Sequence, residues 1–268
     1  MGFFFSFLCS VKSFRNKQQR PKKSALIATP AAVLEALRAG EQLDRIYVQH
    51  QLTAALLDPL RTEALLRQVP VQKVPVEKLN SFHVPEHGGC IAQRSRVRYQ
   101  DLQDVISFVT ERGQVPLFLL LDGITDIRNI GAIARTAWCC GVQALIIPEK
   151  GVGALNEDAL LTSAGALEQI AVCRVNSLMK AVDTLHLNGI RVLASEMTAT
   201  KPVYDCCFNE PCAIVMGGEE KGVYPALMKI CDERFSIPMH HGFESLNVSV
   251  ATGMILYEAM KQRVPALQ

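Results

Sequence analysis

Three short stretches of the sequence combine glycines with polar side chains that can do chemistry. The side chains are a guanidinium, a carboxylate, two amides and a hydroxyl, which are groups that bind substrates, stabilise developing charge or move protons. In chain order the residues are Asn129, Arg135, Gly217, Gly218, Glu219, Ser245 and Asn247. Because the stretches are far apart in the chain, they can form one site only if the fold brings them together.

The spacing of apolar residues after residue 115 predicts alternating strands and helices. The run Leu117–Leu121 is continuously apolar, as in a parallel strand covered on both faces. We expect further strands at residues 144–148, 170–175, 190–195, 213–216 and 235–237, and helices at 129–140, after 156, at 177–187 and at 246–261. Strands separated by helices predict an α/β fold with a parallel sheet and helices on both faces.

All three polar stretches follow expected strands, where ligands of such sheets bind. Each residue also has a simpler explanation, because Asn129, Ser245 and Asn247 could cap helices and Arg135 and Glu219 could be solvated charges. The glycines form neither a G-x-G-x-x-G nor a G-x-x-x-x-G-K-[ST] motif. This pattern disfavours a nucleotide phosphate and leaves an adenosine-type ligand held through backbone groups.

A smaller α/β unit is predicted in front of this sheet. We expect helices at residues 31–39 and 53–67 and strands at 44–49, 71–74 and 89–94. A charged connector at 94–104 leads into a short helix at 102–112. The predicted division is a tail at 1–23, a front domain at 24–95, a linker with a short helix at 96–114 and a larger domain at 115–268.

Composition is that of a soluble globular protein, with 49% hydrophobic and 20% charged residues among 268. The apolar stretch Phe3–Val11 is too short for a membrane helix, so we expect no membrane association. The nine cysteines include no C-x-x-C motif, which favours reduced thiols in a cytoplasmic protein over disulfides or a zinc site. His240 and His241 lack a third ligand at a recognisable spacing, so we expect no metal.

Charge is distributed unevenly along the chain. Residues 1–23 carry six basic residues and no acid, which leaves 22 basic against 26 acidic residues for the remainder. We expect a disordered tail that attracts a polyanion such as RNA, with a solvated extension or an early start codon as the alternatives. Any binding of nucleic acid by the folded part must then depend on local patches.

Together, the three stretches resemble the motifs of the SpoU (TrmH-like) family of RNA 2'-O-ribose methyltransferases, within the SPOUT superfamily. The first resembles N-x-G-A-x-x-R-T-A, present at residues 129–137, and the second resembles G-x-E-x-x-G, present at 217–222. The third resembles I-P-M followed by S-L-N-V-S-V-A, present at 237–239 and 245–251. The resemblance covers about residues 117–261.

The resemblance implies a fold, a cofactor and an assembly. It implies a C-terminal deep trefoil knot, S-adenosylmethionine held in a bent pose, and a homodimer whose active site draws on both subunits. The implied catalytic residues are Asn129, Arg135, Glu219, Ser245 and Asn247. The implied cofactor-binding residues are Met216, Gly217, Gly218, Gly222, Ile237, Met239, Ser245 and Leu246.

In the family, the residue that matches Arg135 is assigned to activation of the ribose hydroxyl. Because a guanidinium resists deprotonation, we expect Arg135 to stabilise the developing alkoxide and to grip the adjacent phosphate. Asn129 is expected to position Arg135 or the ribose. Glu219 is expected to shape the edge of the cofactor pocket and to orient Arg135 or balance its charge.

The start of the final helix carries two structural expectations. Leu246, Val250 and Met254 are expected to hold this helix in the core. Ser249 is expected to be structural and to bond its own backbone, not the substrate.

The front domain is similar to the RNA-binding domain of the family, of the ribosomal-protein L30e type, most clearly at residues 32–37 and 87–92. Thr29 stands where such domains usually have glycine, and Gly88 where many have glutamine. The domain favours a guanosine of 23S ribosomal RNA as the substrate, and transfer RNA is the second candidate. The sequence also leaves open a non-catalytic RNA-binding paralogue and the methylation of a base such as guanine N1.

Overall fold

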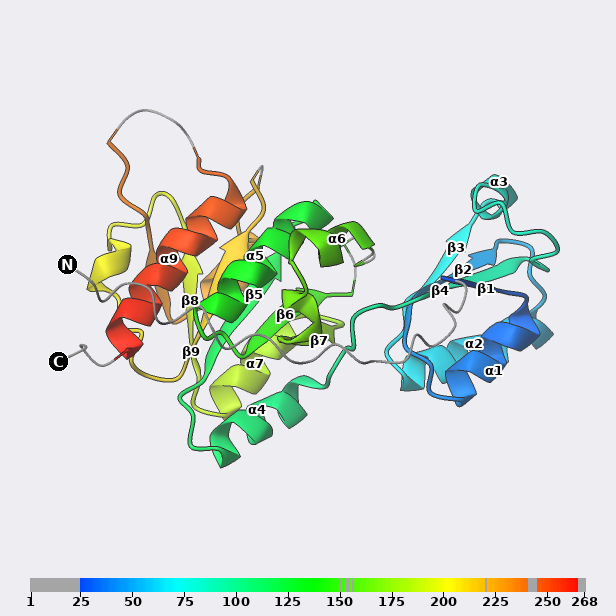
Figure 1. The fold of residues 1–268 in the computed structure, drawn as a ribbon, viewed down its shortest axis with the longest axis horizontal. Coiled ribbons are helices and arrows are strands. Elements are labelled where there is room, and N and C mark those ends of the chain that lie inside the picture. Colours follow the sequence, from blue (N-terminus) through cyan, green and yellow to red (C-terminus); the bar gives the residue numbers. More distant parts are fainter. Residues whose placement is uncertain are drawn as a thin grey trace, which may run out of the picture.

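The computed structural model describes residues 25–149, 151, 152, 155, 157–219, 221–240 and 245–264. The basic tail predicted at 1–23 lies outside these residues. The described chain forms two sheets, each with its own helices and core (Figure 1). We call residues 25–95 the front unit and residues 102–264 the rear unit.

The front unit has a mixed sheet with strand order β1-β4-β2-β3. β4 pairs antiparallel with β1 and β2, whereas β3 pairs parallel with β2. The strands are β1 (Leu26–Ala28), β2 (Leu43–Gln49), β3 (Val71–Val74) and β4 (Cys90–Arg94), and the helices are α1 (Pro30–Arg38), α2 (Ala54–Leu66) and α3 (Val76–Asn80). α1 and α2 lie together on one face of this sheet (Figure 1).

Thr29 adopts a backbone conformation that favours glycine. Its φ is 76°, which is uncommon for a residue with a Cβ. The Thr29 side chain caps α1, because its Oγ1 accepts a hydrogen bond from Ala32 N at 3.4 Å. The cap offsets part of the conformational cost and accounts for a threonine at a glycine-like position.

The rear unit contains a six-stranded sheet with the order β10-β8-β9-β5-β6-β7. Every neighbouring pair in it is parallel, which confirms the predicted parallel sheet. Its strands are β5 (Leu117–Asp122), β6 (Ala144–Pro148), β7 (Ala171–Val175), β8 (Arg191–Ser195), β9 (Cys212–Gly217) and β10 (Glu233–Phe235).

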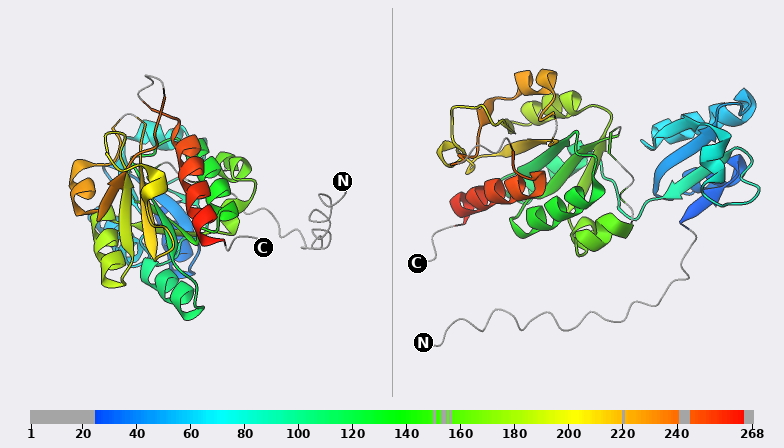
Figure 2. Two further views of the ribbon diagram at one scale, coloured as in Figure 1. Left: turned by 90° about the vertical axis from the view of Figure 1, so that its left-hand side faces the viewer. Right: turned by 90° about the horizontal axis from the view of Figure 1, so that it is seen from above.

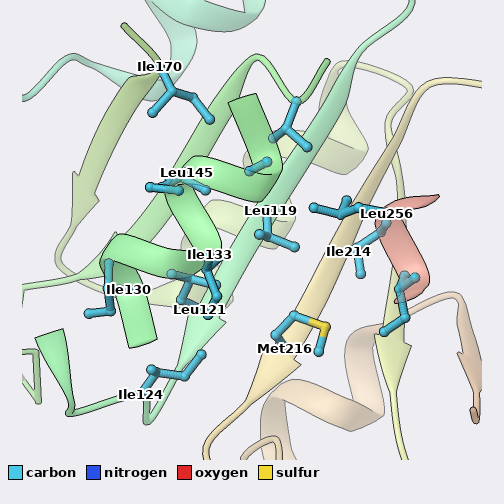
Figure 3. Packing of buried hydrophobic residues seen from close by; sticks show 14 of the residues in the cluster. Leu119, Leu121, Ile124, Ile130, Ile133, Leu145, Ile170, Ile214, Met216 and Leu256 are labelled. Atoms are coloured by element: carbon cyan, nitrogen blue, oxygen red, sulfur yellow. The ribbon is translucent and has the colours of Figure 1, made fainter. Parts of the chain in front are cut away.

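Helices cover both faces of this sheet, as predicted. One face carries α5 (Ile127–Cys139), α6 (Glu157–Thr162) and α9 (Val248–Arg263), and the other carries α4 (Leu102–Glu111), α7 (Leu178–Leu187) and α8 (Pro225–Ile230) (Figure 2). Two short 3-10 helices occur at Ala166–Glu168 and Val203–Asp205. Because both faces are covered, Leu119 and Leu121 pack on the side of α5 (Figure 3), while Phe118 and Leu120 pack on the side of α7.

The elements predicted from the sequence are all present, with ends displaced by a few residues. The strand predicted at 235–237 lies at Glu233–Phe235, because these residues pair with Leu193–Ser195 and Ile237 has already left the sheet. β1, α3, α8 and the two 3-10 helices were not predicted, since segments of three to six residues carry little periodic signal. α4 packs into the rear core and is more than part of a linker.

The predicted orientation of α9 was wrong. Val250 and Met254 are 52% and 48% exposed, and Leu246 is only partly buried before the helix begins. The residues that face the core are Val248, Thr252, Ile255, Leu256 and Ala259. The sequence could not distinguish the two faces, because α9 carries apolar side chains on both.

The eight cysteines within the described residues are free thiols, and Cys9 lies outside them. Cys90 and Cys173 are fully buried, and burial raises the pKa of each to about 12. They are therefore neutral core residues at physiological pH. Within the part of the chain that the structure describes, no helix is long and apolar enough to cross a membrane.

The chain doubles back tightly after β9. Gly218 and Gly222 form an isolated antiparallel bridge, and a Cβ added at Gly217 would overlap the carbonyl carbon of Gly222. A Cβ at Gly218 would overlap the carbonyl oxygen of Gly123, which follows β5. Only glycine allows these backbones to approach so closely.

Replacing Gly217 with alanine is therefore expected to destabilise the rear unit. The new methyl group meets backbone atoms that cannot move independently, so we expect a loss of about 1–3 kcal/mol or more in the free energy of unfolding. This loss lowers the thermal midpoint by roughly 2–4 °C for each kcal/mol, and differential scanning calorimetry measures it. Gly253→Ala is the control, since its Cβ would lie 3.8 Å from Thr136 Cγ2; an equal loss in both variants would contradict the prediction.

Candidate active site

A cavity of about 440 Å³ opens at the carboxyl ends of β8 and β9, between the loop after β9 and the approach to α9. It is bounded by three segments that are distant in the chain, which start near residues 195, 216 and 237. All eight residues predicted to bind a cofactor line it: Met216, Gly217, Gly218, Gly222, Ile237, Met239, Ser245 and Leu246. We call this cavity the donor cavity.

One wall of the donor cavity was missed by the sequence analysis. Ser195, Glu196, Met197 and Thr198 follow β8 directly and line the cavity. A signal for them was present, because β8 was expected to end at Ser195 and ligands bind beyond strand ends. Glu219, which was expected to shape the edge of this pocket, also lines the cavity. The remaining lining residues that were not predicted are Lys221, Val223, Met228, Val248 and Ala251.

A second cavity, of about 380 Å³, adjoins the first. Its own wall comes from the loop after β5 and the start of α5, and includes Thr125, Asp126 and Asn129. The other wall is shared with the donor cavity and consists of Gly218, Glu219, Lys221, Gly222 and Val248. We call it the acceptor-side cavity. The loop after β9 therefore separates two neighbouring spaces.

Glu219 connects the three polar stretches at this wall. Its Oε1 accepts hydrogen bonds from Asn247 Nδ2 at 2.8 Å, from Asn129 Nδ2 at 3.3 Å and from the backbone N of Val248 at 3.3 Å. Asn247 Nδ2 also donates to Asn129 Oδ1 at 3.2 Å. The structure thus joins Asn129, Glu219 and Asn247 directly, although 118 positions separate the first from the last.

The Glu219 carboxylate lies at the N-terminus of α9, where the free N–H groups of a helix favour negative charge. Asn247 is the N-cap residue of α9, and its Oδ1 accepts from Ser249 N at 2.9 Å and from Ser249 Oγ at 2.6 Å. The expectation that Ser249 bonds its own backbone was therefore wrong, since its hydroxyl bonds the capping side chain. Ser245, exposed before the helix, lines the donor cavity.

Arg135 lies apart from this network. It is exposed on α5 and lines neither cavity, and its side chain has no hydrogen bond or ion pair with any residue that the structure describes. Six positions along a helix correspond to a rotation of about 240°, so Arg135 and Asn129 face different directions. Asn129 bonds Glu219 and Asn247 instead. Neither Asn129 nor Glu219 makes the expected contact with Arg135 of the same chain.

No group of three or more His, Cys, Asp or Glu side chains among the described residues is arranged to hold a metal ion. The chemistry available at the two cavities consists of the Asn129 amide, the carboxylates of Asp126, Glu196 and Glu219, the Lys221 ammonium, several hydroxyls and backbone groups. Such a site can bind and orient polar ligands.

The Glu219 network predicts the local stability of α9. In Glu219→Ala, the Val248 amide loses its acceptor and the helix N-terminus loses a stabilising charge, so exchange of the Val248 amide hydrogen should accelerate about tenfold. Hydrogen exchange followed by NMR measures this rate. Glu168→Ala removes another exposed carboxylate and should leave the rate unchanged. Equal rates in all three proteins would show that Glu219 does not hold this turn.

Two curated relatives resemble the chain over most of its length. A protein assigned to the TrmH family of tRNA/rRNA methyltransferases, YacO of Bacillus subtilis, is 30% identical over 87% of this chain and 94% of its own. The 23S rRNA (guanosine-2'-O-)-methyltransferase RlmB of Vibrio parahaemolyticus is 34% identical over 88% of this chain and 94% of its own.

Solved structures share the fold. The SpoU methyltransferase AviRb from Streptomyces viridochromogenes superposes with a TM-score of 0.57, at 24% identity, over 89% of each chain. AviRb in complex with its cofactor AdoMet gives a TM-score of 0.56.

Family models match both units of the chain. The model described as RNA 2'-O ribose methyltransferase substrate binding matches residues 31–100. The model described as SpoU rRNA Methylase family matches residues 116–257, which include both cavities and all three polar stretches. The chain therefore belongs to the SpoU family of RNA methyltransferases.

Proposed function

We propose that the protein transfers a methyl group from S-adenosylmethionine to a ribose 2'-hydroxyl of RNA. The observation that carries this proposal is the wall held by Glu219, which has the donor cavity on one side and the acceptor-side cavity on the other. Two ligands bound there would lie on either side of one loop. A direct transfer between two substrates needs this adjacency.

S-adenosylmethionine fits the donor cavity. The volume lies within the range of about 300–1,000 Å³ that is usual for small-ligand sites. Met216, Ile237 and Leu246 offer apolar surface to the adenosine, and the backbone of Gly217 and Gly218 offers hydrogen-bonding groups. When bound, this cofactor supplies a methyl group attached to a sulfonium sulfur. The sulfur leaves as a neutral thioether, which is a good leaving group.

The protein must then align the ribose oxygen and remove its proton. We assign the target ribose to the acceptor-side cavity, where the Asn129 amide is fixed by Glu219 and Asn247. As the oxygen attacks the methyl carbon, the carbon–sulfur bond breaks and the hydroxyl proton leaves to solvent or to a neighbouring base. Ser245 lines the donor cavity and contacts the donor, whereas Asn247 lines neither cavity and acts by fixing Asn129 and Glu219.

Arg135 is proposed to act on the site of a partner subunit. It faces away from the cavities of its own chain, and its guanidinium can stabilise an alkoxide and a neighbouring phosphate. The outer face of α5 and α9 around it is apolar: Trp138, Val250, Met254 and Tyr257 are each about half exposed, at 48%, 52%, 48% and 61%. These helices lie side by side (Figures 1 and 2), and the exposed apolar side chains that they carry support a homodimer.

The remaining parts of the proposal concern the fold and the substrate. We infer that the tight loop after β9 belongs to a deep trefoil knot, and that the front unit is an L30e-like domain that binds RNA. A guanosine of 23S ribosomal RNA is the favoured target, since RlmB acts there, and transfer RNA is the second candidate because relatives carry both substrates in their names. The free thiols support action in the cytoplasm.

Methylation of defined RNAs tests this function. Unmodified transcripts of 23S ribosomal RNA and of transfer RNA are incubated with the protein and S-adenosylmethionine, and the products are digested to nucleosides. A 2'-O-methylguanosine product from the ribosomal transcript is expected. A methylated base would overturn the proposed chemistry, and RNA binding without cofactor binding would indicate a non-catalytic paralogue.

Arg135→Ala is expected to reduce methyl transfer by at least about 100-fold, as loss of a group that stabilises developing charge does. The Kd for S-adenosylmethionine, measured by calorimetry, should stay unchanged because Arg135 does not line the donor cavity. Arg112→Ala is the control, since Arg112 is exposed on the far face and stacks only on Phe108. Near-normal turnover by Arg135→Ala would contradict a role for Arg135 in stabilising the developing charge.

Met254→Glu is expected to convert a dimer into monomers, because it places a charge in the apolar face of α9. Light scattering coupled to size exclusion measures the mass, and Leu187→Glu, at a residue 89% exposed on α7, is the control. If Met254→Glu kept the dimer mass of the unaltered protein, this face would be excluded as the interface.

Sharing of the site between subunits has its own test. A mixture of Arg135→Ala and Glu219→Ala chains, allowed to exchange subunits, should regain activity, since mixed dimers then contain one site with both residues intact. If both residues act within one chain, the mixture would stay inactive.

A further inference from the structure

A polar cluster lies buried where the front and rear units meet, away from both cavities. Its members are Arg174 of β7, Asp44 of β2 and Tyr99 of the linker. The side chains of Arg174 and Asp44 are only 7% and 6% exposed. β7 is the edge strand of the rear sheet, on the side that faces the front unit (Figure 1).

Arg174 reaches out of the rear unit and binds the backbone of the front unit. Its Nη1 donates to the carbonyl of Asp44 at 2.7 Å, and its Nη2 donates to the carbonyls of Gln68 at 2.8 Å and of Leu43 at 3.3 Å. These carbonyls belong to the start of β2 and to the turn after α2. One guanidinium therefore holds two segments of the front unit.

Tyr99 completes the cluster from the linker. The guanidinium carbon of Arg174 lies 3.9 Å from the centre of the Tyr99 ring, and Tyr99 OH donates to Asp44 Oδ1 at 2.5 Å. The linker backbone is also fixed to β7. Tyr99 forms an isolated parallel bridge with Val172 of this strand, and Gln100 N donates to the Val172 carbonyl at 2.9 Å. The connection between the units is thus fastened to the rear sheet.

The energetics of this cluster favour a role in orientation. Buried ion pairs add little net stability, because desolvation offsets the attraction between the charges. Arg174 Nη1 and Asp44 Oδ1 are 3.7 Å apart, and Asp44 Oδ2 and Arg174 Nε have no hydrogen-bond partner within the described chain. Apolar side chains of similar size would stabilise the joint at least as well, but only directional bonds to fixed carbonyls select one orientation of the two units.

We infer that Arg174 is a positioning residue for the methylation of RNA. By fixing the front unit on β7, it sets the orientation in which RNA held by the front unit presents its target ribose to the acceptor-side cavity. A second contact supports the same orientation, since Arg45 Nη2 of β2 donates to the carbonyl of Val152 in the rear unit at 3.0 Å. This inference rests on the proposed function in that RNA must bridge the two units.

The test compares Arg174→Met with Arg112→Met in the full chain. Arg112 is the matched control, because its guanidinium carbon also lies over an aromatic ring, 4.1 Å from the centre of Phe108, without a contact between the units. In Arg174→Met we expect faster hydrogen exchange over residues 97–101 and a larger maximum dimension in small-angle X-ray scattering. Arg112→Met should match the unaltered protein in both.

Kinetics separate positioning from stability. For Arg174→Met, kcat/KM for an unmodified 23S ribosomal RNA transcript should fall about 10- to 100-fold through misalignment, while the Kd for S-adenosylmethionine stays the same. A purely structural role would lower the thermal midpoint and the fraction of active sites but leave kcat/KM per active site unchanged. That result, or unchanged scattering and exchange, would overturn the inference.

A second variant guards against misfolding of the front unit, because Arg174→Met leaves the Asp44 carboxylate buried without its cation. The double variant Arg174→Met, Asp44→Asn removes this charge as well. It should show the same change in scattering and in kcat/KM. If the unaltered protein methylates no RNA, the proposed function fails, whereas scattering and exchange still decide whether Arg174 holds the units together.

Discussion

One carboxylate oxygen, Oε1 of Glu219, accepts hydrogen bonds from two amide side chains and from the first turn of α9. The donors come from the start of α5 and from the start of α9, two segments that are far apart in the chain. The close backbone contacts at Gly217 and Gly218 place Glu219 at this position. The loop after β9, the start of α5 and the start of α9 therefore depend on one another.

This constraint explains the division of the site into two spaces, because both cavities share the wall that contains Glu219. The fixed amides of Asn129 and Asn247 need no ordering when ligands bind, which lowers the entropic cost of binding. Arg174 and Tyr99 use directional bonds in the same way, to define the orientation of the front and rear units. In both places, polar contacts specify geometry in a protein whose stability comes from the apolar cores of its two sheets.

Much of this arrangement was determined by the sequence alone. Continuous apolar runs such as Leu117–Leu121 predicted parallel strands, and the rule that ligands bind beyond strand ends selected the three polar stretches, because these signals are local and periodic. Short segments such as α8, and the strand at Glu233–Phe235, carried too little periodicity to be placed correctly. The motif resemblance identified residues of the donor cavity, but not the segment Ser195–Thr198 that lines the same space.

Only the tertiary structure decided which side chains meet. The orientation of α9 depends on where Asn247 caps it, and the partners of Asn129 depend on a loop 90 positions away, so neither follows from spacing along the chain. Likewise, Arg174, Asp44 and Tyr99 look like ordinary charged and aromatic residues until the two units are placed together. Local periodicity depends only on residues that are close in the sequence, whereas contacts between distant segments arise from the packing of the whole chain.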